Sequence, residues 1–567
     1  MHRLLLSLAP LLAATGAAAG ADLVEARGTG LRVPRGFMAE RVADFAVAGE
    51  IHAFTLDRFG RGVVPGPGSL GRLGDQNLDR RADLAVLAAP VRTAGWGVAA
   101  AGPDIWWAGD DGLWRFRDAD GDGRADGTGE KVLAITTGPN AAHALALGPD
   151  GFLHLGAGFA TAFTNATHAG DPASPFVRFE AGAVLRSTGT ERAEAWTVGL
   201  RNPRGLAFST EGPLLAWDAE DPREAFLPWG LPTRLIEVPA GLRQGWLRAE
   251  EAGSWALPER QPDSTEALSR VADAVPGGLA VYRHAVLPGA WWGRVLAADT
   301  ANARVLAFRL SPGTGGWTAL AEVFVQGAPG TFFPLGIEVA PDGAVLIASG
   351  GRGTGAGVYR VAPLRPANDV LAAQAQLASE RPIEGVLRAP QPLSAWSLEA
   401  WRPAAEALGG GAFLAAARDP RRPADERIRA IEVAAQLFGG LDETTAGALL
   451  QDVRPELRAR AAWSLGVTGP PFLGRALAAL LSDASPAVRR EAAGVLLLRR
   501  HELPREAVAE WLGGLLADPD FRVRRIAVTL GDRLDEATWD GLWAQRGRRP
   551  LAAQLTLGFA ALRRRGG

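Results

Sequence analysis

The chain has 567 residues, of which 47% are hydrophobic and 22% are charged, a composition typical of globular proteins and not of disordered chains. Its 60 basic and 62 acidic residues give a net charge of −2, so the charge balance gives no indication of nucleic-acid binding. The chain has no cysteine, which excludes disulfides, thiolate metal sites and covalently attached haem. Lys131 is the only lysine, so a phosphate-binding-loop lysine or a Schiff base has almost no candidate.

The first 21 residues have the pattern of a secretory signal peptide. Arg3 precedes an apolar stretch over residues 4–14, and small residues follow at 17–21. An uncleaved anchor or an ordinary apolar terminus is the alternative. The stretch is shorter than the roughly 20 apolar residues of a membrane span, and no later segment is long and apolar enough. We therefore expect an exported protein, periplasmic or secreted, with no transmembrane span.

Short apolar runs alternate with Gly, Pro and Asp turns over residues 30–365. Asp-Gly in front of an apolar run is a strong hairpin signal. Six such turns serve as anchors, near residues 57, 103, 149, 211, 292 and 342. Repeating units of about 40–50 residues with several short strands are typical of propeller blades. The sequence predicts an all-β six-bladed β-propeller over 30–365, with a β-sandwich or two smaller barrels as the alternative.

The composition changes over residues 366–567. Ala, Leu, Arg and Glu dominate there, and the apolar residues recur at helical spacing. One pattern recurs, with copies at 428–432, 457–462, 488–493 and 523–527. Asp452, Asp483 and Asp518 stand before the last three copies, and we expect each of them to be a helix N-cap. The period is that of paired helices stacked side by side. The sequence predicts a multidomain protein whose second part is an all-α HEAT-like solenoid, with a plain helical bundle as the alternative.

Four carboxylates in the segment 118–126 have the spacing of a metal-binding loop. Asp118, Asp120, Asp122 and Asp126 stand at relative positions 1, 3, 5 and 9, with glycine at position 6, which matches the first part of a calcium loop. The usual glutamate at position 12 is replaced by Gly129. The pattern predicts a Ca²⁺ site, and an acidic turn satisfied by its own backbone is the alternative.

His143 lies just before a Gly-Pro-Asp-Gly turn, at the start of an expected propeller strand. From there its side chain can face the central channel and act as a general base, because the pKa of histidine lies near neutral pH. A structural histidine is the alternative. Arg201 and Asn202, in a Gly-Leu-Arg-Asn-Pro segment, offer donors suited to a carboxylate-bearing ligand, or else form a turn with an asparagine cap.

These motifs follow one another in an order that resembles a known family. The acidic loop, the histidine before Gly-Pro-Asp-Gly and Gly-Leu-Arg-Asn-Pro are followed by Pro-Trp-x-x-Pro-Thr-Arg, Gly-Trp and Gly-Gly-Arg-x-x-x-x-Gly-Val-Tyr-Arg-Val. The chain is similar to the PVC-type "membrane-bound dehydrogenase" propeller proteins. In that family a six-bladed domain of the glucose/sorbosone dehydrogenase type precedes HEAT-like repeats and often a cytochrome c domain.

The resemblance implies a dehydrogenase that uses pyrroloquinoline quinone (PQQ) and calcium. It makes His143 the base, places Arg201 and Asn202 at the cofactor or substrate, and makes Arg352 or Arg360 a further cofactor contact. A sugar or glycan-like small molecule is the implied ligand. Because the chain has no cysteine, it carries no cytochrome c domain, and the electrons would pass to an external acceptor such as a cytochrome.

Two functions from different classes remain open at this stage. One is an exported quinoprotein-like dehydrogenase that oxidises a sugar or polyol. The other is a non-catalytic scaffold whose propeller binds a glycan or protein and whose solenoid binds a protein partner on its concave face. Convergence of the candidate side chains at one mouth of the channel would favour the enzyme.

Overall fold

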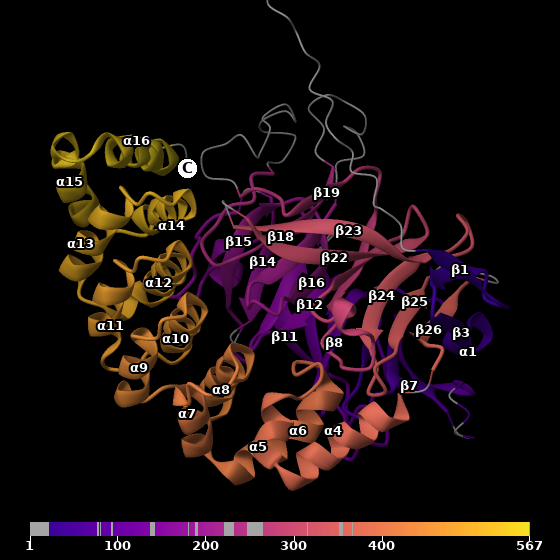
Figure 1. Cartoon of the computed structure of the whole chain (residues 1–567). Helices are drawn as coiled ribbons and strands as arrows, with labels where there is room; N and C mark the ends of the chain where they lie inside the picture. The colour runs from indigo at the N-terminus through magenta and orange to yellow at the C-terminus, as the bar shows by residue number, and fades with distance from the viewer. Residues whose placement is uncertain are drawn as a thin grey trace, which may run out of the picture.

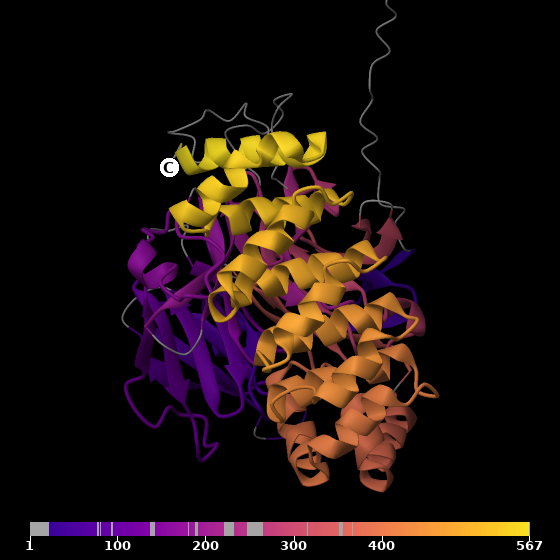
Figure 2. The same ribbon diagram turned by 90° about the vertical axis from the view of Figure 1, so that its left-hand side faces the viewer.

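The computed structural model describes residues 22–75, 77, 79, 81–91, 95–135, 142–179, 181–187, 191–219, 232–246, 265–313, 316–350, 355–365 and 367–565 (Figure 1). The expected signal peptide, residues 1–21, and Arg352 lie outside these residues. The described part consists of a six-bladed β-propeller followed by a curved row of helices along one side of it, as Figures 1 and 2 show. The predicted fold class is therefore confirmed.

Each blade is an antiparallel sheet whose first strand lies innermost. In chain order the strands are β1 (Leu23–Ala26), β2 (Leu31–Pro34), β3 (Phe37–Asp44), β4 (Thr55–Leu56), β5 (Gly62–Gly66), β6 (Ser69–Gly74), β7 (Leu84–Pro90), β8 (Gly95–Ala101), β9 (Asp104–Gly109), β10 (Gly112–Arg117), β11 (Glu130–Ala134), β12 (Ala142–Leu147), β13 (Leu153–Ala157), β14 (Gly182–Ser187), β15 (Ala193–Leu200), β16 (Pro203–Phe208), β17 (Leu214–Asp218), β18 (Thr233–Glu237), β19 (Ser269–Val271), β20 (Pro276–Val281), β21 (Val295–Asp299), β22 (Arg304–Gly313), β23 (Gly316–Gln326), β24 (Pro334–Val339), β25 (Val345–Ser349) and β26 (Gly357–Pro363). Blades 1 to 6 begin with β4, β8, β12, β16, β20 and β24.

The ring is closed by pairing the early strands with late ones. β3 forms the outermost strand of blade 6 against β26, and β2 and β1 extend blade 5 beyond β23. This pairing joins the two ends of the propeller sequence without a disulfide. All six turn anchors fall in the connection between the first and second strand of a blade, so they mark equivalent places in the fold.

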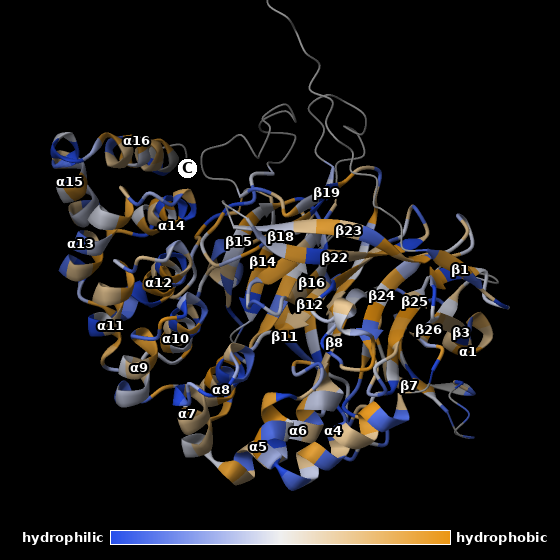
Figure 3. Ribbon diagram, in the orientation of Figure 1, coloured by the Kyte–Doolittle hydropathy of each residue, from blue (hydrophilic) through white to orange (hydrophobic). Residues whose placement is uncertain are grey.

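Small residues let the inner strands approach one another around the axis. A Cβ on Gly205 of β16 would lie 2.7 Å from the Cβ of Leu279 in β20. A Cβ on Gly336 of β24 would lie 2.6 Å from the Cβ of Phe54, just before β4. Only glycine fits such contacts without moving the backbone. The blades are apolar between these contacts, as the orange strands of Figure 3 show.

The solenoid is built from antiparallel helix pairs. Its helices are α4 (Asn368–Glu380), α5 (Pro382–Leu387), α6 (Ala395–Leu408), α7 (Gly410–Arg418), α8 (Ala424–Leu437), α9 (Glu443–Leu450), α10 (Pro455–Thr468), α11 (Leu473–Leu480), α12 (Pro486–Arg499), α13 (Arg505–Leu515), α14 (Phe521–Asp532), α15 (Glu536–Ala544) and α16 (Leu551–Arg565). The four sequence copies form α8, α10, α12 and α14, which stack on one another and face the propeller (Figures 1 and 2). Among the described residues no helix is long and apolar enough to cross a membrane.

Arginine–aspartate pairs join successive repeats. Arg458 of α10 binds Asp483 through two hydrogen bonds of 2.8 Å, and Arg489 of α12 binds Asp518 at 2.7 and 2.9 Å. The expectation that these aspartates are helix N-caps is wrong. Asp483 instead accepts a hydrogen bond from the backbone N–H of Ser485, which is the N-cap residue of α12. Arg458 of the preceding repeat holds the carboxylate of Asp483. Asp483 therefore orders the loop before α12 and does not cap the first turn of that helix.

The concave face of the solenoid lies against the propeller of the same chain. Arg522 of α14 forms an ion pair of 2.5 Å with Glu237 of β18, and both side chains are buried. Thr529 donates to the carbonyl of Gly241 at 2.8 Å. Arg500, just after α12, donates to the carbonyls of residues 172–174 at 2.8–3.2 Å. The concave face is the surface expected to bind a separate protein partner. At these contacts it is instead covered by the propeller of the same chain.

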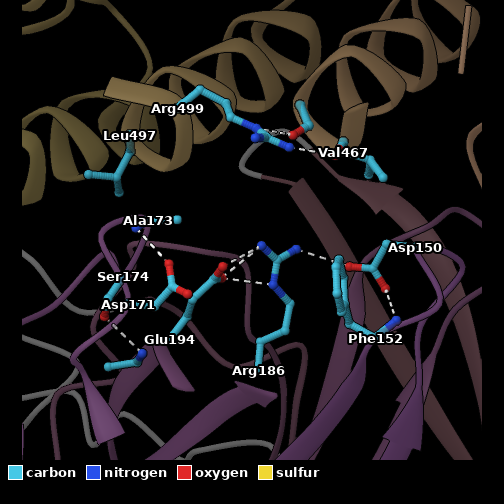
Figure 4. Close-up of polar contacts among 12 residues, drawn as sticks. Asp150, Phe152, Asp171, Ala173, Ser174, Arg186, Glu194, Val467, Leu497 and Arg499 are labelled. Carbon is cyan, nitrogen blue, oxygen red and sulfur yellow. Dashed lines mark hydrogen bonds and ion pairs between the residues drawn. The ribbon is translucent and has the colours of Figure 1, made fainter. Parts of the chain in front are cut away.

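Blade 3 carries a buried charge network beneath this interface, shown in Figure 4. Arg186 binds both carboxylate oxygens of Glu194, at 2.8 and 2.9 Å, and Asp150 at 3.0 Å. Asp150 also accepts the backbone N–H of Phe152, which fixes the turn between β12 and β13. The two carboxylates raise the pKa of Arg186 against the opposing effect of burial, so the network keeps its charges.

Candidate functional site

Five of the six inner strands have a β-bulge one residue after their start. The register shifts between Gly95 and Gly97 in β8, Ala142 and Ala144 in β12, Pro203 and Gly205 in β16, Pro276 and Leu279 in β20, and Pro334 and Gly336 in β24. The bulged residues are Trp96, His143, Arg204, Gly277 with Gly278, and Leu335. A bulge re-aims the side chain of its extra residue. Because the inner strands surround one axis, these residues stand at one level, which we call the bulge ring.

His52 of blade 1 lies next to the bulge ring, just before β4, which has no bulge of its own. The N–H of His52 donates to Pro65 at 2.9 Å just before β4, and its imidazole stacks on Trp96 with 4.4 Å between ring centroids. Trp96 in turn meets the ring of His143 edge-on at 6.4 Å. Three aromatic rings from three successive blades therefore form a continuous surface at the mouth where the inner strands begin.

His143 is the most buried titratable group of the bulge ring. His143 is 4% exposed. Burial lowers the pKa of its imidazole to about 3, and the positive charge of Arg204 acts in the same direction. The imidazole is therefore neutral at physiological pH. Within the part of the chain that the structure describes, no group hydrogen-bonds to Nε2. In the tautomer protonated at Nδ1, this nitrogen has a lone pair that can take a proton from a ligand.

Arg204 stands beside His143, and Arg201 stands beside Arg204. Burial and the neighbouring charge of Arg201 lower the pKa of Arg204, so the two guanidinium groups are close enough to repel each other. The guanidinium of Arg201 lies over the ring of Phe159, 5.4 Å from its centroid, and Phe159 packs on Trp246 at 5.3 Å. Two like charges beside a neutral imidazole favour an anionic ligand at this mouth.

Asp218, at the end of β17, fixes the backbone that carries these arginines. Its carboxylate accepts the N–H of Asn202 at 2.7 Å and of Arg201 at 3.1 Å. Arg234 donates a hydrogen bond of 2.6 Å to the same carboxylate of Asp218. These four residues lie in blade 4 or just before it. Asn202 is 2% exposed and belongs to this buried turn. The structure thus brings Arg201 to the mouth with His143, while the backbone of Asn202 anchors the turn.

The other end of the channel is covered by the solenoid. A cavity of about 140 Å³ is lined by residues from the second half of the inner strands and by residues 391–395, which lead into α6. Gln391 donates to the carbonyl of Val281 at 3.0 Å and accepts the N–H of Arg283. Glu338 lines this cavity, and burial raises its pKa to about 7. The bulge ring lies at the opposite end of the same strands.

The remaining cofactor candidates are not brought to this mouth by the described residues. Arg360, on the third strand of blade 6, binds Glu40 at 3.0 Å and Asp342 at 2.6 Å, and so serves an ion-pair network within that blade. Arg352 lies outside the described residues. Lys131, the single lysine, pairs with Asp111 at 2.8 Å on the outer strand of blade 2.

The acidic loop lies between blades 1 and 2. Oxygen atoms of Asp118, Asp120 and Asp122 come within 4.8 Å of one another, while Asp126 accepts the N–H of Ala119 at 3.0 Å. Asp118 also accepts the N–H groups of Gly121 and Gly123, which folds the loop as in a calcium-binding turn. Burial raises the pKa of Asp118 despite these bonds.

Three arginines of blade 1 hold this loop in place. Arg58, Arg61 and Arg72 donate to its backbone carbonyls at 2.5–3.1 Å. Nitrogens of Arg61 and Arg72 also lie 3.9 and 3.8 Å from Oδ2 of Asp118. The loop therefore ties two blades together, and its first carboxylate has guanidinium groups nearby that compete with a cation for that oxygen.

Sequence reasoning missed His52, Trp96 and Arg204. A signal for them exists, because each stands immediately before glycine or alanine at the entrance of a blade, as His143 does. The small residue after the bulge permits the close approach of inner strands, and the residue before it points to the channel mouth. Aligning the blades on these pairs would have identified the bulge ring.

A family model of HEAT repeats matches residues 443–531. Among curated proteins, none matches this chain in sequence. Solved structures resemble the propeller at low identity. The holo form of the pyranose dehydrogenase PQQ domain from Coprinopsis cinerea is 11% identical, with 60% of this chain and 98% of that chain covered and a TM-score of 0.45. The PQQ-bound aldose sugar dehydrogenase of Streptomyces coelicolor and the apo-form soluble aldose sugar dehydrogenase of Escherichia coli are each 16% identical, with 58% and 99% covered and a TM-score of 0.42. At these identities the likeness concerns the propeller fold alone.

Proposed function

We propose that the chain is a quinoprotein-like dehydrogenase that oxidises a hydroxyl group of a sugar or polyol at the bulge ring. The observation that carries this proposal is His143, a buried neutral imidazole whose Nε2 has no partner among the described residues and which stands beside Arg204, itself next to Arg201. Buried polar atoms are usually hydrogen-bonded, so a buried nitrogen without a partner is a candidate for contact with a ligand. The position of His143 next to Arg204 in the bulge ring favours the role of a base.

The described mouth suits a flat cofactor that bears carboxylates, such as PQQ. Arg201 and Arg204 provide guanidinium groups for the carboxylates, and the rings of Trp96 and Phe159 provide flat apolar surface. When bound, PQQ would supply the acceptor for the hydride of the substrate. Lys131 has no part in this site, because it is paired with Asp111.

The residues of the chain would handle the proton. The substrate hydroxyl would donate a hydrogen bond to Nε2 of His143, which takes that proton while the neighbouring carbon loses hydride and becomes a carbonyl carbon. Burial keeps His143 neutral before this transfer. Trp96 is half-buried, so part of its surface is available to a sugar ring. The two electrons would leave to an external acceptor such as a cytochrome, since the chain has no haem-binding cysteine.

Calcium and export belong to the same proposal. The converging oxygens of Asp118, Asp120 and Asp122 support a Ca²⁺ ion in the acidic loop, where it would brace blade 2 against blade 1. The signal-like pattern of residues 1–21 supports export to the periplasm or the exterior. Export is tested by the N-terminal sequence of the protein recovered from its producing cells, which should start close to residue 22.

A non-catalytic propeller that binds a glycan at the same mouth is the second candidate. The half-buried Trp96 favours this candidate, because the exposed part of an indole ring offers a flat surface on which a sugar ring can stack. It predicts saccharide binding without turnover. Its second component, a partner on the concave face of the solenoid, is disfavoured by the contacts of that face with the propeller.

The test is reconstitution of the full chain with PQQ and Ca²⁺, followed by dye reduction over a panel of sugars and polyols. The proposal expects saturable PQQ binding and turnover of at least one substrate. Arg204→Gln should weaken PQQ binding at least about 10-fold, as expected for loss of one buried charged contact. Arg360→Gln is the matched control and should leave binding unchanged. Saccharide binding with neither PQQ binding nor turnover would support the scaffold instead.

A further inference from the structure

Helix α16 carries apolar residues on two opposite faces. Ala553, Leu557 and Ala560 are fully buried on the side that packs against α14. Leu551, Leu555 and Leu562 are 69%, 66% and 69% exposed. With about 100° per residue, these three leucines fall within about 40° of one another, so they form one stripe on the outer side. We call them the leucine stripe.

The segment around this stripe has no negative charge. Residues 551–562 contain no charged side chain at all, and residues 541–567 contain six arginines and no aspartate or glutamate. Arg546 and Arg548, just before the helix, are exposed. Arg564 turns back to the carbonyls of Gly531 and Leu534 and pairs with Glu536 at 2.8 Å, so its charge is compensated within the solenoid. The leucine stripe is therefore flanked by positive charge and has no acidic neighbour within its own segment.

Helix α16 lies at the far end of the row of described helices, with its outer side turned away from α14 (Figure 1). Exposed apolar residues in a row mark a contact surface, since isolated ones are common but stripes are not. Some other surface is therefore expected to cover the leucine stripe.

We propose that α16 docks on an anionic lipid surface, with the leucine stripe in the acyl boundary and the arginines at the lipid phosphates. Uncharged helical turns with leucines on one side and arginines at the ends have the chemistry of helices that lie flat in a membrane interface. Each arginine near an anionic surface adds attraction that salt weakens. Two copies of the chain meeting through this stripe would instead bring their arginine clusters together, which opposes self-association.

The experiment is co-sedimentation of the full-length protein with vesicles of phosphatidylcholine alone or mixed with phosphatidylglycerol, at low and at 0.5 M salt. The proposal expects binding at least about 10-fold stronger to the anionic vesicles, and loss of that difference at high salt. The triple variant Leu551→Gln/Leu555→Gln/Leu562→Gln should bind at least about 10-fold more weakly. Because the three side chains are exposed, its melting temperature should match that of the wild type.

The matched control is Leu320→Gln, which makes the same change at a leucine that is 70% exposed on β23 of the propeller. It should leave vesicle binding unchanged. Arg546→Gln/Arg548→Gln should weaken binding to anionic vesicles and reduce its salt dependence. Equal binding by wild type and triple variant, or no vesicle binding at low salt, would overturn the proposal. So would a dimer, seen by light scattering, that the triple variant converts to monomer, since a second copy would then cover the stripe.

Discussion

His143 and Arg204 occupy the same place in adjacent blades, each as the extra residue of the bulge that follows the first residue of the inner strand. Their charges interact, because the guanidinium of Arg204 helps to lower the pKa of His143. The blade repeat therefore does more than build a scaffold. It places Trp96, His143, Arg204 and Leu335 at equivalent positions of the inner strands of blades 2, 3, 4 and 6, whereas blade 5 has two glycines there.

The close approach of the inner strands makes the glycines that follow three of the bulges, Gly97, Gly205 and Gly336, sensitive to a single methyl group. In Gly205→Ala the new Cβ would lie 2.7 Å from the Cβ of Leu279 and 2.9 Å from the carbonyl oxygen of Gly277, so the backbone must shift. We expect a loss of about 1–3 kcal/mol in the free energy of unfolding, measured by urea denaturation. Gly541→Ala in α15, where a Cβ meets nothing within 4 Å, should be neutral or stabilising by up to about 1 kcal/mol. Equal effects of the two variants would contradict the packing explanation.

The architecture could be predicted from the sequence because it repeats. Each turn anchor marks a connection that recurs six times, and the arginine–aspartate pattern recurs in the solenoid with a nearly constant period. The contact between the two parts could not be predicted. Arg522 and Glu237 are 285 residues apart in the sequence, and no pattern in either segment relates one to the other.

The site was predicted less completely than the fold. His143, Arg201 and Asn202 stand in recognisable motifs, and the structure places the first two at one mouth. His52 and Trp96 have no motif of their own. The place of Trp96 depends on the bulge of β8, which is a register property invisible in composition, and His52 stacks on Trp96. The motif around Arg360 predicts a cofactor contact, but its guanidinium pairs with Glu40 and Asp342 within blade 6.

Removing the carboxylate of Glu237 should destabilise the contact between propeller and solenoid. Glu237→Gln leaves Arg522 buried without its ion-pair partner, and we expect a loss of about 3 kcal/mol. Glu443→Gln breaks a pair of similar length, 2.6 Å to Arg475, but both of its side chains are largely exposed. That control should cost under about 1 kcal/mol. Calorimetry of the full chain measures both, and a loss in Glu237→Gln no larger than in the control would show that the interface does not depend on this pair.

Buried histidines should make the protein acid-sensitive. Burial lowers the pKa of His154 to about 4, whereas in the unfolded chain it titrates near 6.5. Between these values the unfolded state binds the proton and the folded state does not, so stability falls as the pH is lowered from about 6.5 to about 4. The slope from this group is about 1.4 kcal/mol per pH unit.

His154→Leu tests this contribution. The variant should lose stability less steeply on acidification, as measured by urea midpoints from pH 7.5 to pH 4.5. Glu338 acts in the opposite sense, because its folded pKa of about 7 lies above its unfolded value, and so it favours the folded state as the pH falls from 7 towards 4.5. An unchanged slope in His154→Leu would mean that the imidazole is protonated in the folded protein.

The acidic loop offers a test by metal removal. If Ca²⁺ binds Asp118, Asp120 and Asp122, a chelator should lower the melting temperature, and added calcium should restore it. Asp120→Ala should remove this calcium dependence. A melting temperature indifferent to chelator would show instead that Arg61 and Arg72 alone neutralise Asp118.

The most direct test of the account is the rate of dye reduction by wild type and His143→Gln, each loaded with PQQ and Ca²⁺ and given the same sugar. The account predicts turnover by the wild type and a kcat at least about 100-fold lower in the variant, which is the contribution of a general base, with the melting temperature and PQQ affinity unchanged. A variant as active as the wild type would contradict the assignment of His143 and, with it, the bulge ring as the active site.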